Sequence, residues 1–306
     1  MPSPSAEFFA QGTPNTGVQF MPVAETYPTN ERKGFANPNL VSRLRELEPQ
    51  SYLLLDEAFA QVAPEVVSAH FNEVEELGLT REESVNQVYF GQLVLNAFDG
   101  EIATELVAAK PLRHSKEVAH ETAAMHTLNS LDPRRTAPLS YEPLGFYKME
   151  DGRTVLLTRY DHPVKTQDTI FWRPDREPTL TEINRGLSHA AFALGSLHYY
   201  GFTHGDAQVK NVAHDNRGVR YVDLTNLDSH VPDAAVDPFT VRQRVVGDVR
   251  RYVTSLATES LLDVDAYVEP VREVFAPMYV RIASNPESQV PEEAQITREE
   301  IAEMLL

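Results

Sequence analysis

The sequence predicts an α+β protein in which a small sheet-bearing region precedes a larger, mainly helical region. Between Val85 and Leu112, apolar residues are interspersed with polar ones on both sides of an Asp99–Gly100 turn, a pattern typical of a β-hairpin. From Leu180 onward, apolar residues recur at the spacing of an α-helix. An apolar content of 42% over 306 residues supports an ordinary core in one large domain or in two packed lobes.

The N-terminal part of the chain is predicted to be an extension. Residues 1 to about 39 are rich in proline and show no helical or alternating period, so this stretch either wraps the body or stays mobile. We divide the chain into this extension over residues 1–50, a sheet-bearing region over 51–160 and a helical region over 161–306. The extension is also a candidate contact for a protein partner.

The sheet-bearing region is expected to contain a helix between its strands. Ser115 is a suitable N-cap for a helix from Lys116 to about Asn129. After a proline-bearing loop, the apolar run from Thr154 to Thr158 predicts a further strand. The order strand, strand, helix, strand predicts a small lobe with a mixed sheet and one helix.

The helical region begins with a sequence that has the spacing of a capping box, from Thr179 to Glu182. The helix that it starts keeps its apolar period until Gly201, and a short strand is expected from Val219 to Val222. Further helices are predicted over residues 241–262 and 264–282 and after Thr297. The boundary between the lobes should fall near residues 160–163, where a ligand-binding cleft is expected.

Composition excludes several classes of function. Without cysteine, the chain has no disulfide, no cysteine zinc site and no thiol catalysis, which fits a reducing compartment and predicts a cytoplasmic protein. A net charge of -18 argues against nucleic acid or an anionic membrane as a partner. No apolar run approaches the ~18 residues of a membrane span, and the first residues lack the pattern of a secretory signal.

A cluster of basic residues is the local exception to this acidic balance. Arg242, Arg244, Arg250 and Arg251 fall within ten residues of one predicted helix. They either face an anionic substrate or form a helix face that is paired with nearby carboxylates, and the second interpretation is favoured.

The most informative segment runs from His204 to Asn211 and is followed by the strand that ends at Asp223. Asp206, Asn211 five residues later and Asp223 after a short apolar run can meet at one point. The first side chain can orient a hydroxyl, while the other two hold magnesium against the phosphates of a nucleotide. This polar set is typical of phosphoryl transfer.

The segment resembles the protein-kinase-like superfamily, on the side of the aminoglycoside and choline phosphotransferases, the RIO kinases and the lipopolysaccharide kinases. The loop of this family runs His-x-Asp-x-x-x-x-Asn, and His204, Asp206 and Asn211 match its spacing. The resemblance covers roughly residues 80 to 270. It implies a bilobal protein-kinase-like fold and an activity that depends on ATP and Mg²⁺.

The resemblance also implies roles for the residues of the loop. Asp206 would orient or deprotonate the acceptor hydroxyl, and Asn211 and Asp223 would coordinate magnesium bridging the ATP phosphates. His204 is expected to pack and to anchor the backbone rather than to act as a base.

Three charged residues outside the loop match further positions of the family. Lys110, at the end of a predicted strand, would contact the ATP phosphates, and Glu121 on the following helix would fix its ammonium group. Glu117, one turn earlier, is the alternative partner, and Glu121 is favoured because it lies on the inward side of the helix. Asp248 is either a buried brace for the catalytic loop or a solvated residue on a helix face.

The chain departs from the family in ways that keep other functions open. The acidic stretch at residues 80–86 stands where a glycine-rich loop would cradle phosphates, and Gln208 replaces the lysine of protein kinases. We predict a Mg-ATP-dependent phosphotransferase that acts on a hydroxyl of a small molecule, sugar or glycolipid whose identity the sequence does not specify. The alternatives are an atypical protein kinase, a pseudokinase that acts as an interaction scaffold, and nucleotidyl transfer to a protein.

Overall fold

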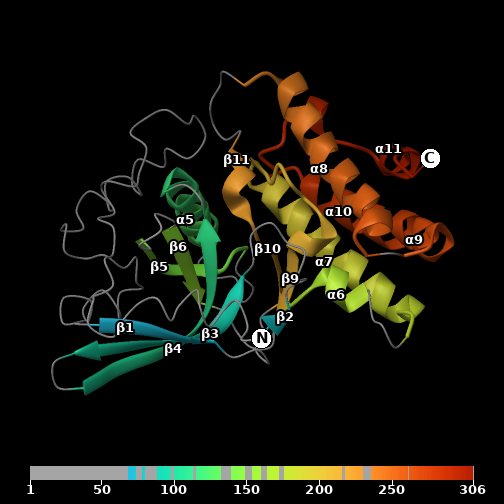
Figure 1. Cartoon of the computed structure of the whole chain (residues 1–306). Helices are drawn as coiled ribbons and strands as arrows, with labels where there is room; N and C mark the ends of the chain where they lie inside the picture. The colour runs from blue at the N-terminus through green and yellow to red at the C-terminus, as the bar shows by residue number, and fades with distance from the viewer. Residues whose placement is uncertain are drawn as a thin grey trace. The chain divides into compact units, whose positions relative to one another are not determined.

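The computed structural model describes residues 68–73, 78–79, 88–97, 100–112, 115–131, 139–148, 154–159, 164–171, 176–215, 218–229, 236–260 and 262–305. It is an α+β structure with small antiparallel sheets and several helices (Figure 1). These residues form two compact units, which we describe separately. Unit 1 holds the described residues of 68–127 and 141–164, and unit 2 holds those of 128–140 and 165–305. The predicted extension over residues 1–50 and the acidic stretch 80–86 lie outside the described residues.

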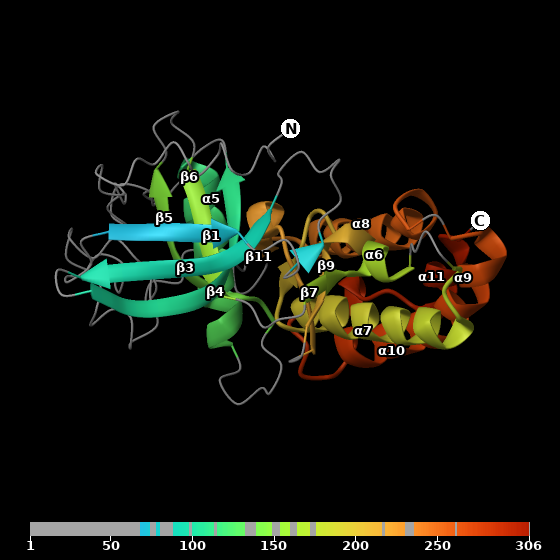
Figure 2. The ribbon, with the colours of Figure 1, turned by 60° about the horizontal axis from the view of Figure 1, so that its bottom comes forward.

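Unit 1 is built on a five-stranded sheet with the order β1-β3-β4-β6-β5. Figure 2 shows β1, β3 and β4 running side by side. The strands are β1 Ser68–Glu73, β3 Tyr89–Ala97, β4 Gly100–Leu112, β5 Glu142–Lys148 and β6 Thr154–Arg159, and a two-residue strand, β2, spans Gly78–Leu79. Every neighbouring pair in the five-stranded sheet is antiparallel, so the prediction of a mixed sheet is wrong. The connection between β3 and β4 is too short for the crossover that a parallel pair needs.

Helix α5, Ser115–Ser130, follows β4 and agrees with the helix predicted over residues 116–129. Its buried positions include Glu121, Ala124 and Leu128. The sheet contributes Val107 and Leu156 to the core, and both side chains are fully buried. Val107 of β4 and Leu156 of β6 therefore belong to the core of unit 1.

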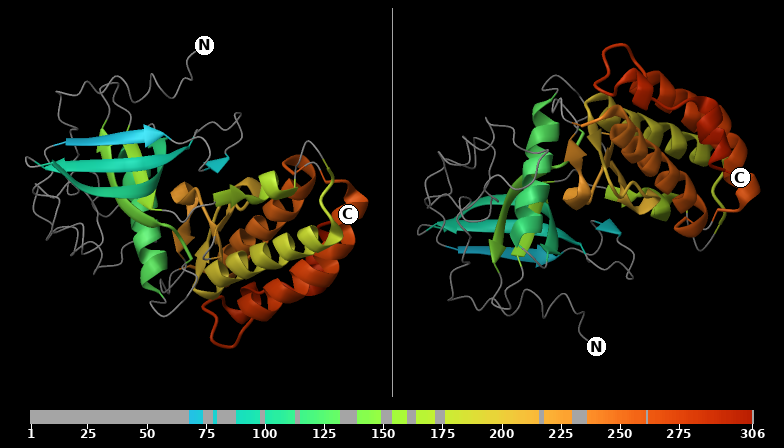
Figure 3. Two further views of the ribbon diagram at one scale, coloured as in Figure 1. Left: turned by 90° about the horizontal axis from the view of Figure 1, so that it is seen from below. Right: turned by 90° about the horizontal axis from the view of Figure 1, so that it is seen from above.

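Unit 2 is organised around α7, Leu180–Tyr199. The predicted capping box is present, because Thr179 accepts from the amide of Glu182 and the Glu182 carboxylate accepts from the amide of Thr179. The helix ends at Tyr199 with Tyr200 as its C-cap, and Gly201 follows with a φ of 81°, as the glycine stop predicted. Figure 3 shows α7 and α10, Ala276–Ala283, lying side by side.

The remaining helices of unit 2 are α6 Gln167–Phe171, α8 Pro238–Thr258, α9 Val264–Pro270 and α11 Arg298–Glu303. The single helix predicted over residues 264–282 is instead α9, a π-helical turn at Val271–Phe275, and α10. Pro277 has no N–H to donate to the carbonyl of Glu273, so the regular α-helical hydrogen bonds are interrupted here. Thr297 forms the second predicted capping box, at the start of α11.

Short antiparallel strands hold the loops that carry the candidate site. In unit 2, β9 Val212–Asp215 pairs with β10 Gly218–Tyr221 and with β7 Val164–Thr166. A second pair joins β8 Phe202–Thr203 to β11 Asp228–Ser229. Among the described helices, none is both long enough and apolar enough to cross a membrane.

Candidate active site

The candidate catalytic loop spans His204 to Asn211, between β8 and β9, and is braced by a carboxylate from α8. Asp248 is only 2% exposed. Its Oδ2 accepts from the amide of His204 at 2.6 Å, and its Oδ1 accepts from the amide of Gly205 at 2.9 Å. The interpretation of Asp248 as a buried brace is therefore confirmed, and the alternative of a solvated helix residue is wrong.

Asp248 also connects the loop to two further helices. Nε2 of His198, on α7, lies 3.2 Å from Asp248 Oδ2, and Nδ1 of the same ring lies 2.5 Å from the hydroxyl of Tyr279 on α10. Burial raises the pKa of Tyr279 well above its usual range, so the hydroxyl keeps its proton. The carboxylate of Asp248 can only accept, which places a proton on Nε2 of His198.

His204 anchors two pieces of backbone. Its Nε2 donates to the carbonyl of Val222 at 2.9 Å, and its Nδ1 accepts from the amide of Asp206 at 3.2 Å. A ring that donates through one nitrogen and accepts through the other is neutral. Burial lowers the pKa of His204, against the opposing charge of Asp248, which agrees with a neutral ring. The structure confirms His204 as a packed, backbone-anchoring residue.

The strand that leads to Asp223 is attached to the same loop at Val222. The amide of Val222 donates to the carbonyl of Asn211 at 2.8 Å, while its carbonyl accepts from His204. Asp223 follows directly, in the left-handed region at φ 59° and ψ 62°, and its Oδ1 accepts from Thr225 Oγ1 at 2.9 Å. This backbone conformation is uncommon for a residue other than glycine and occurs often at functional sites.

The side chains of Asp206 and Asn211 contact each other. Nδ2 of Asn211 donates to the Asp206 carbonyl at 2.9 Å and to Asp206 Oδ2 at 3.2 Å. Both partners are acceptors, so the amide nitrogen of Asn211 must face them and its Oδ1 points elsewhere. The structure thus brings Asp206 and Asn211 together and places Asp223 next to the residue that is bonded to Asn211.

The oxygen atoms of Asn211 and Asp223 fit the ligands that magnesium takes. Magnesium prefers a few carboxylate or amide oxygens from the protein and completes its shell with phosphate and water. In the described part of the chain, no three His, Asp or Glu side chains gather as a metal site. The binding of magnesium by Asn211 Oδ1 and the Asp223 carboxylate stays a prediction.

Lys110 and Glu121 form an ion pair in unit 1. Lys110 Nζ lies 3.0 Å from Oε1 and 2.9 Å from Oε2 of Glu121, whose side chain is 1% exposed. The preference for Glu121 over Glu117 as the partner of Lys110 is confirmed. The contact of this lysine with ATP phosphates stays a prediction.

The arginines of α8 are divided among separate partners. The ion pairs are Arg242 with Glu300, Arg244 with Asp228 at 2.6 Å and Arg251 with Asp206 at 2.8 Å. A helix face paired with carboxylates is therefore the correct interpretation for these three residues. The link between Arg251 and Asp206 is a contact that the sequence did not reveal, because the two residues are 45 positions apart.

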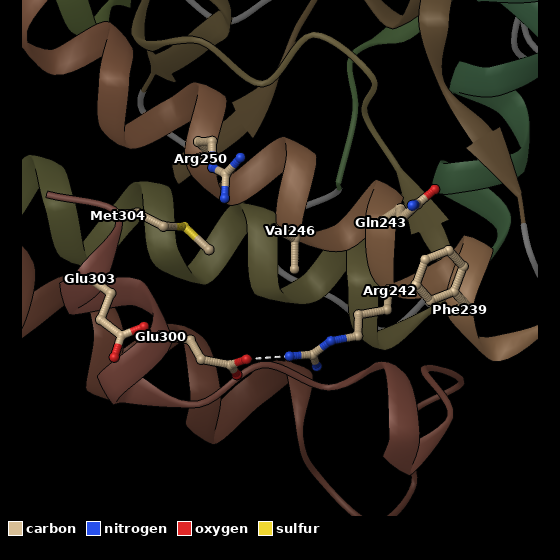
Figure 4. Close-up of a pocket in the computed structure, with 8 residues that line it drawn as sticks. All are labelled: Phe239, Arg242, Gln243, Val246, Arg250, Glu300, Glu303 and Met304. Atoms are coloured by element: carbon tan, nitrogen blue, oxygen red, sulfur yellow. Dashed lines mark hydrogen bonds and ion pairs between the residues drawn. The ribbon is translucent and has the colours of Figure 1, made fainter. Parts of the chain in front are cut away.

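A pocket of about 460 Å³ lies between α8 and α11 (Figure 4). Arg250, Glu303 and Met304 are among its lining residues, and the ion pair of Arg242 with Glu300 crosses it. None of the candidate catalytic residues lines this pocket.

No protein-family model matches the chain, and a search of curated proteins gave no match. The assignment of the site therefore depends on the residues and contacts described above.

Proposed function

We propose that the protein is a Mg-ATP-dependent phosphotransferase that transfers a phosphoryl group to a hydroxyl of a small molecule, sugar or glycolipid. The observation that supports this proposal is the attachment of Val222 to His204 and Asn211, because Asp223 directly follows Val222 and Asn211 contacts Asp206. We further propose that units 1 and 2 are the smaller and larger lobes of a protein-kinase-like fold. A five-stranded sheet with α5 in unit 1 and the helices of unit 2 support that assignment.

In this proposal, each polar residue has a distinct task. Asp206 receives the hydroxyl of the acceptor and accepts its proton, while Asn211 fixes the orientation of the carboxylate through Oδ2. Asn211 Oδ1 and Asp223 would hold the metal ion, which when bound would neutralise charge on the nucleotide phosphates. Lys110, whose ammonium group pairs with Glu121, would contribute a positive charge to the phosphates of a nucleotide. Catalysis then comes mainly from positioning and from charge neutralisation.

The nucleotide site is tested by thermal-shift titration with Mg-ATP. We expect a magnesium-dependent stabilisation of the wild type, which amounts to about 2.7 kcal/mol at 100 times the dissociation constant. Asp223→Ala should remove the shift, because it removes the metal-holding carboxylate. Asp228→Ala is the matched control, because Asp228 pairs with Arg244 instead. A wild type that shows no shift at millimolar Mg-ATP would contradict the proposal and favour a scaffold.

Chemistry is tested separately by ADP release with a panel of hydroxyl-bearing acceptors. Turnover should require magnesium and fall by at least about 100-fold in Asp206→Ala, whose nucleotide-dependent stabilisation should persist. Equal turnover in the wild type and in Asp206→Ala would show that this loop does not perform the reaction.

A further inference from the structure

Helix α8 holds the catalytic loop at a second point, one turn after Asp248. Nη1 of Arg251 donates to the carbonyl of Gly205 and to Oδ1 of Asp206, both at 2.8 Å. Residues three apart on a helix lie on the same face. Asp248 therefore accepts from the amides of His204 and Gly205, while Arg251 donates to the carbonyl of Gly205 and to the carboxylate of Asp206.

The other donors to the Asp206 carboxylate belong to the loop itself. Gln208 Nε2 donates to Oδ1 at 2.9 Å, and Asn211 Nδ2 donates to Oδ2 at 3.2 Å. Because these residues are two and five positions away, they move with the loop. Arg251 lies on α8, a helix of 21 residues, so its hydrogen bond attaches the Asp206 carboxylate to a helix of unit 2.

Arg251 is also the basic side chain that faces Asp206. Gln208 carries no charge, and Lys210 is directed to Glu259, with its Nζ 3.7 Å from Oε1. His204 contacts the segment as a neutral ring. Within the described residues, Arg251 alone makes an ion pair with Asp206.

We infer that Arg251 is the positioning residue of the catalytic loop. Its guanidinium group orients Asp206 toward the acceptor and supplies the local positive charge that Gln208 lacks. The effect on catalysis rests on the proposed function, whereas the effect on the loop does not. Arg251 is half-exposed at 49%, so its replacement leaves the core of unit 2 in place.

The adjacent residue provides a matched control. Arg250 is exposed, lines the pocket between α8 and α11, and makes no ion pair with a described residue (Figure 4). Arg250→Gln and Arg251→Gln therefore make the same chemical change at neighbouring positions, one away from the loop and one on it.

The first measurement is hydrogen exchange of the unliganded full chain, followed by mass spectrometry of peptides that cover residues 202–212. Arg251→Gln should increase exchange in this segment, because the loop loses its contact with α8, while Arg250→Gln should match the wild type. Arg251→Lys should lie between them, since one nitrogen makes both contacts and an ammonium group can replace part of them. Unchanged exchange in Arg251→Gln would overturn the inference, whatever the protein catalyses.

The second measurement separates kcat from KM, with Mg-ATP as the probe and ADP release as the signal. Arg251→Gln should lower kcat by roughly 10- to 100-fold and change the KM for ATP less than about 2-fold, because misplacing a reacting group slows the chemical step. Arg251→Lys should recover part of kcat, and Arg250→Gln should equal the wild type. A wild-type kcat in Arg251→Gln would overturn the inference, whereas a wild type that neither binds nor turns over ATP would overturn the proposed function and leave the exchange result to decide on the loop.

Discussion

At the scale of single residues, Gly205 shows how closely the candidate catalytic loop approaches the segment after Asp223. Its φ is 76°, and a Cβ atom at this position would lie 2.6 Å from the carbonyl oxygen of Asn226. Such a distance is too short for a carbon and a backbone oxygen, so a side chain here would force the two segments apart. Glycine is therefore required both by the backbone conformation and by the space available.

We predict that Gly205→Ala destabilises the protein and separates the loop from the segment that carries Asp223. The left-handed conformation alone costs an alanine roughly 1–2 kcal/mol, and the contact with Asn226 adds to this. Urea denaturation should show the loss, and Mg-ATP turnover should fall with it.

Gly247→Ala is the control for this substitution. Gly247 is an exposed residue of α8, and a Cβ atom there would meet nothing within 4 Å. Alanine should therefore raise the free energy of unfolding by up to about 1 kcal/mol. If both alanine variants were equally stable, the tight approach at Gly205 would be refuted.

At the scale of elements, one carboxylate joins three helices to the candidate catalytic loop. Asp248 on α8 accepts from two loop amides, contacts His198 on α7, and through that ring reaches Tyr279 on α10. Asp248, His198, His204 and Tyr279 are all buried, so an unmet hydrogen bond among them is costly.

Asp248→Asn is expected to lower the free energy of unfolding by roughly 1–3 kcal/mol. The asparagine side chain has the shape of aspartate but a single oxygen, so in either orientation its NH₂ group meets an N–H of Gly205 or of His204. The loop should then shift, and turnover of Mg-ATP should fall along with stability as measured by urea denaturation.

Tyr279→Phe distinguishes the brace from the rest of the network. It removes only the hydroxyl that contacts His198, so we expect a smaller loss of about 1 kcal/mol and turnover close to that of the wild type. Wild-type stability and turnover in Asp248→Asn would refute the role of Asp248 as the brace. Losses of stability and turnover in Tyr279→Phe as large as those in Asp248→Asn would refute it as well.

The elements themselves follow from local sequence signals, whereas their contacts do not. The capping box at Thr179 and the glycine stop at Gly201 bound α7 as predicted, because caps act within a few residues. The π-helical turn at Val271–Phe275 was missed, since the apolar period continues through it. Periodicity describes which face is buried but not how the backbone adjusts around a proline.

At the scale of the whole molecule, the sequence predicted which residues belong to the candidate site but not the long-range contacts that hold them. The spacing of Asp206, Asn211 and Asp223 predicted residues that could meet, and the preference for Glu121 as the partner of Lys110 came from the inward face of one helix. The contacts of Arg251 with Asp206 and of His198 with Tyr279 span 45 and 81 positions. Such contacts depend on tertiary packing, for which a single sequence carries no local signal.

Several histidines and tyrosines with shifted pKa values make the stability of the fold depend on pH. Burial, and after it the neighbouring His189, lowers the pKa of His214 to about 4, and burial also lowers the pKa values of His189 and His204. Burial raises the pKa values of Tyr221, Tyr252 and Tyr279. The folded state therefore favours neutral histidines and protonated tyrosines.

The free energy of unfolding should be highest between about pH 6.5 and pH 10, the usual pKa values of histidine and tyrosine. A histidine with a lowered pKa stabilises the fold fully above pH 6.5, and this stability is lost as the pH falls, because the unfolded chain binds the proton more readily. A tyrosine with a raised pKa stabilises the fold below pH 10, and this contribution is lost as the pH rises further. Each pKa unit corresponds to about 1.4 kcal/mol, so His214 alone should account for a loss of roughly 2 kcal/mol between pH 7 and pH 5.

Urea denaturation at pH 7, 6 and 5 measures this loss, and His214→Gln should reduce it, because glutamine does not titrate. The same acid dependence in His214→Gln and in the wild type would show that the ring pair of His214 and His189, with centroids 5.6 Å apart, does not control it.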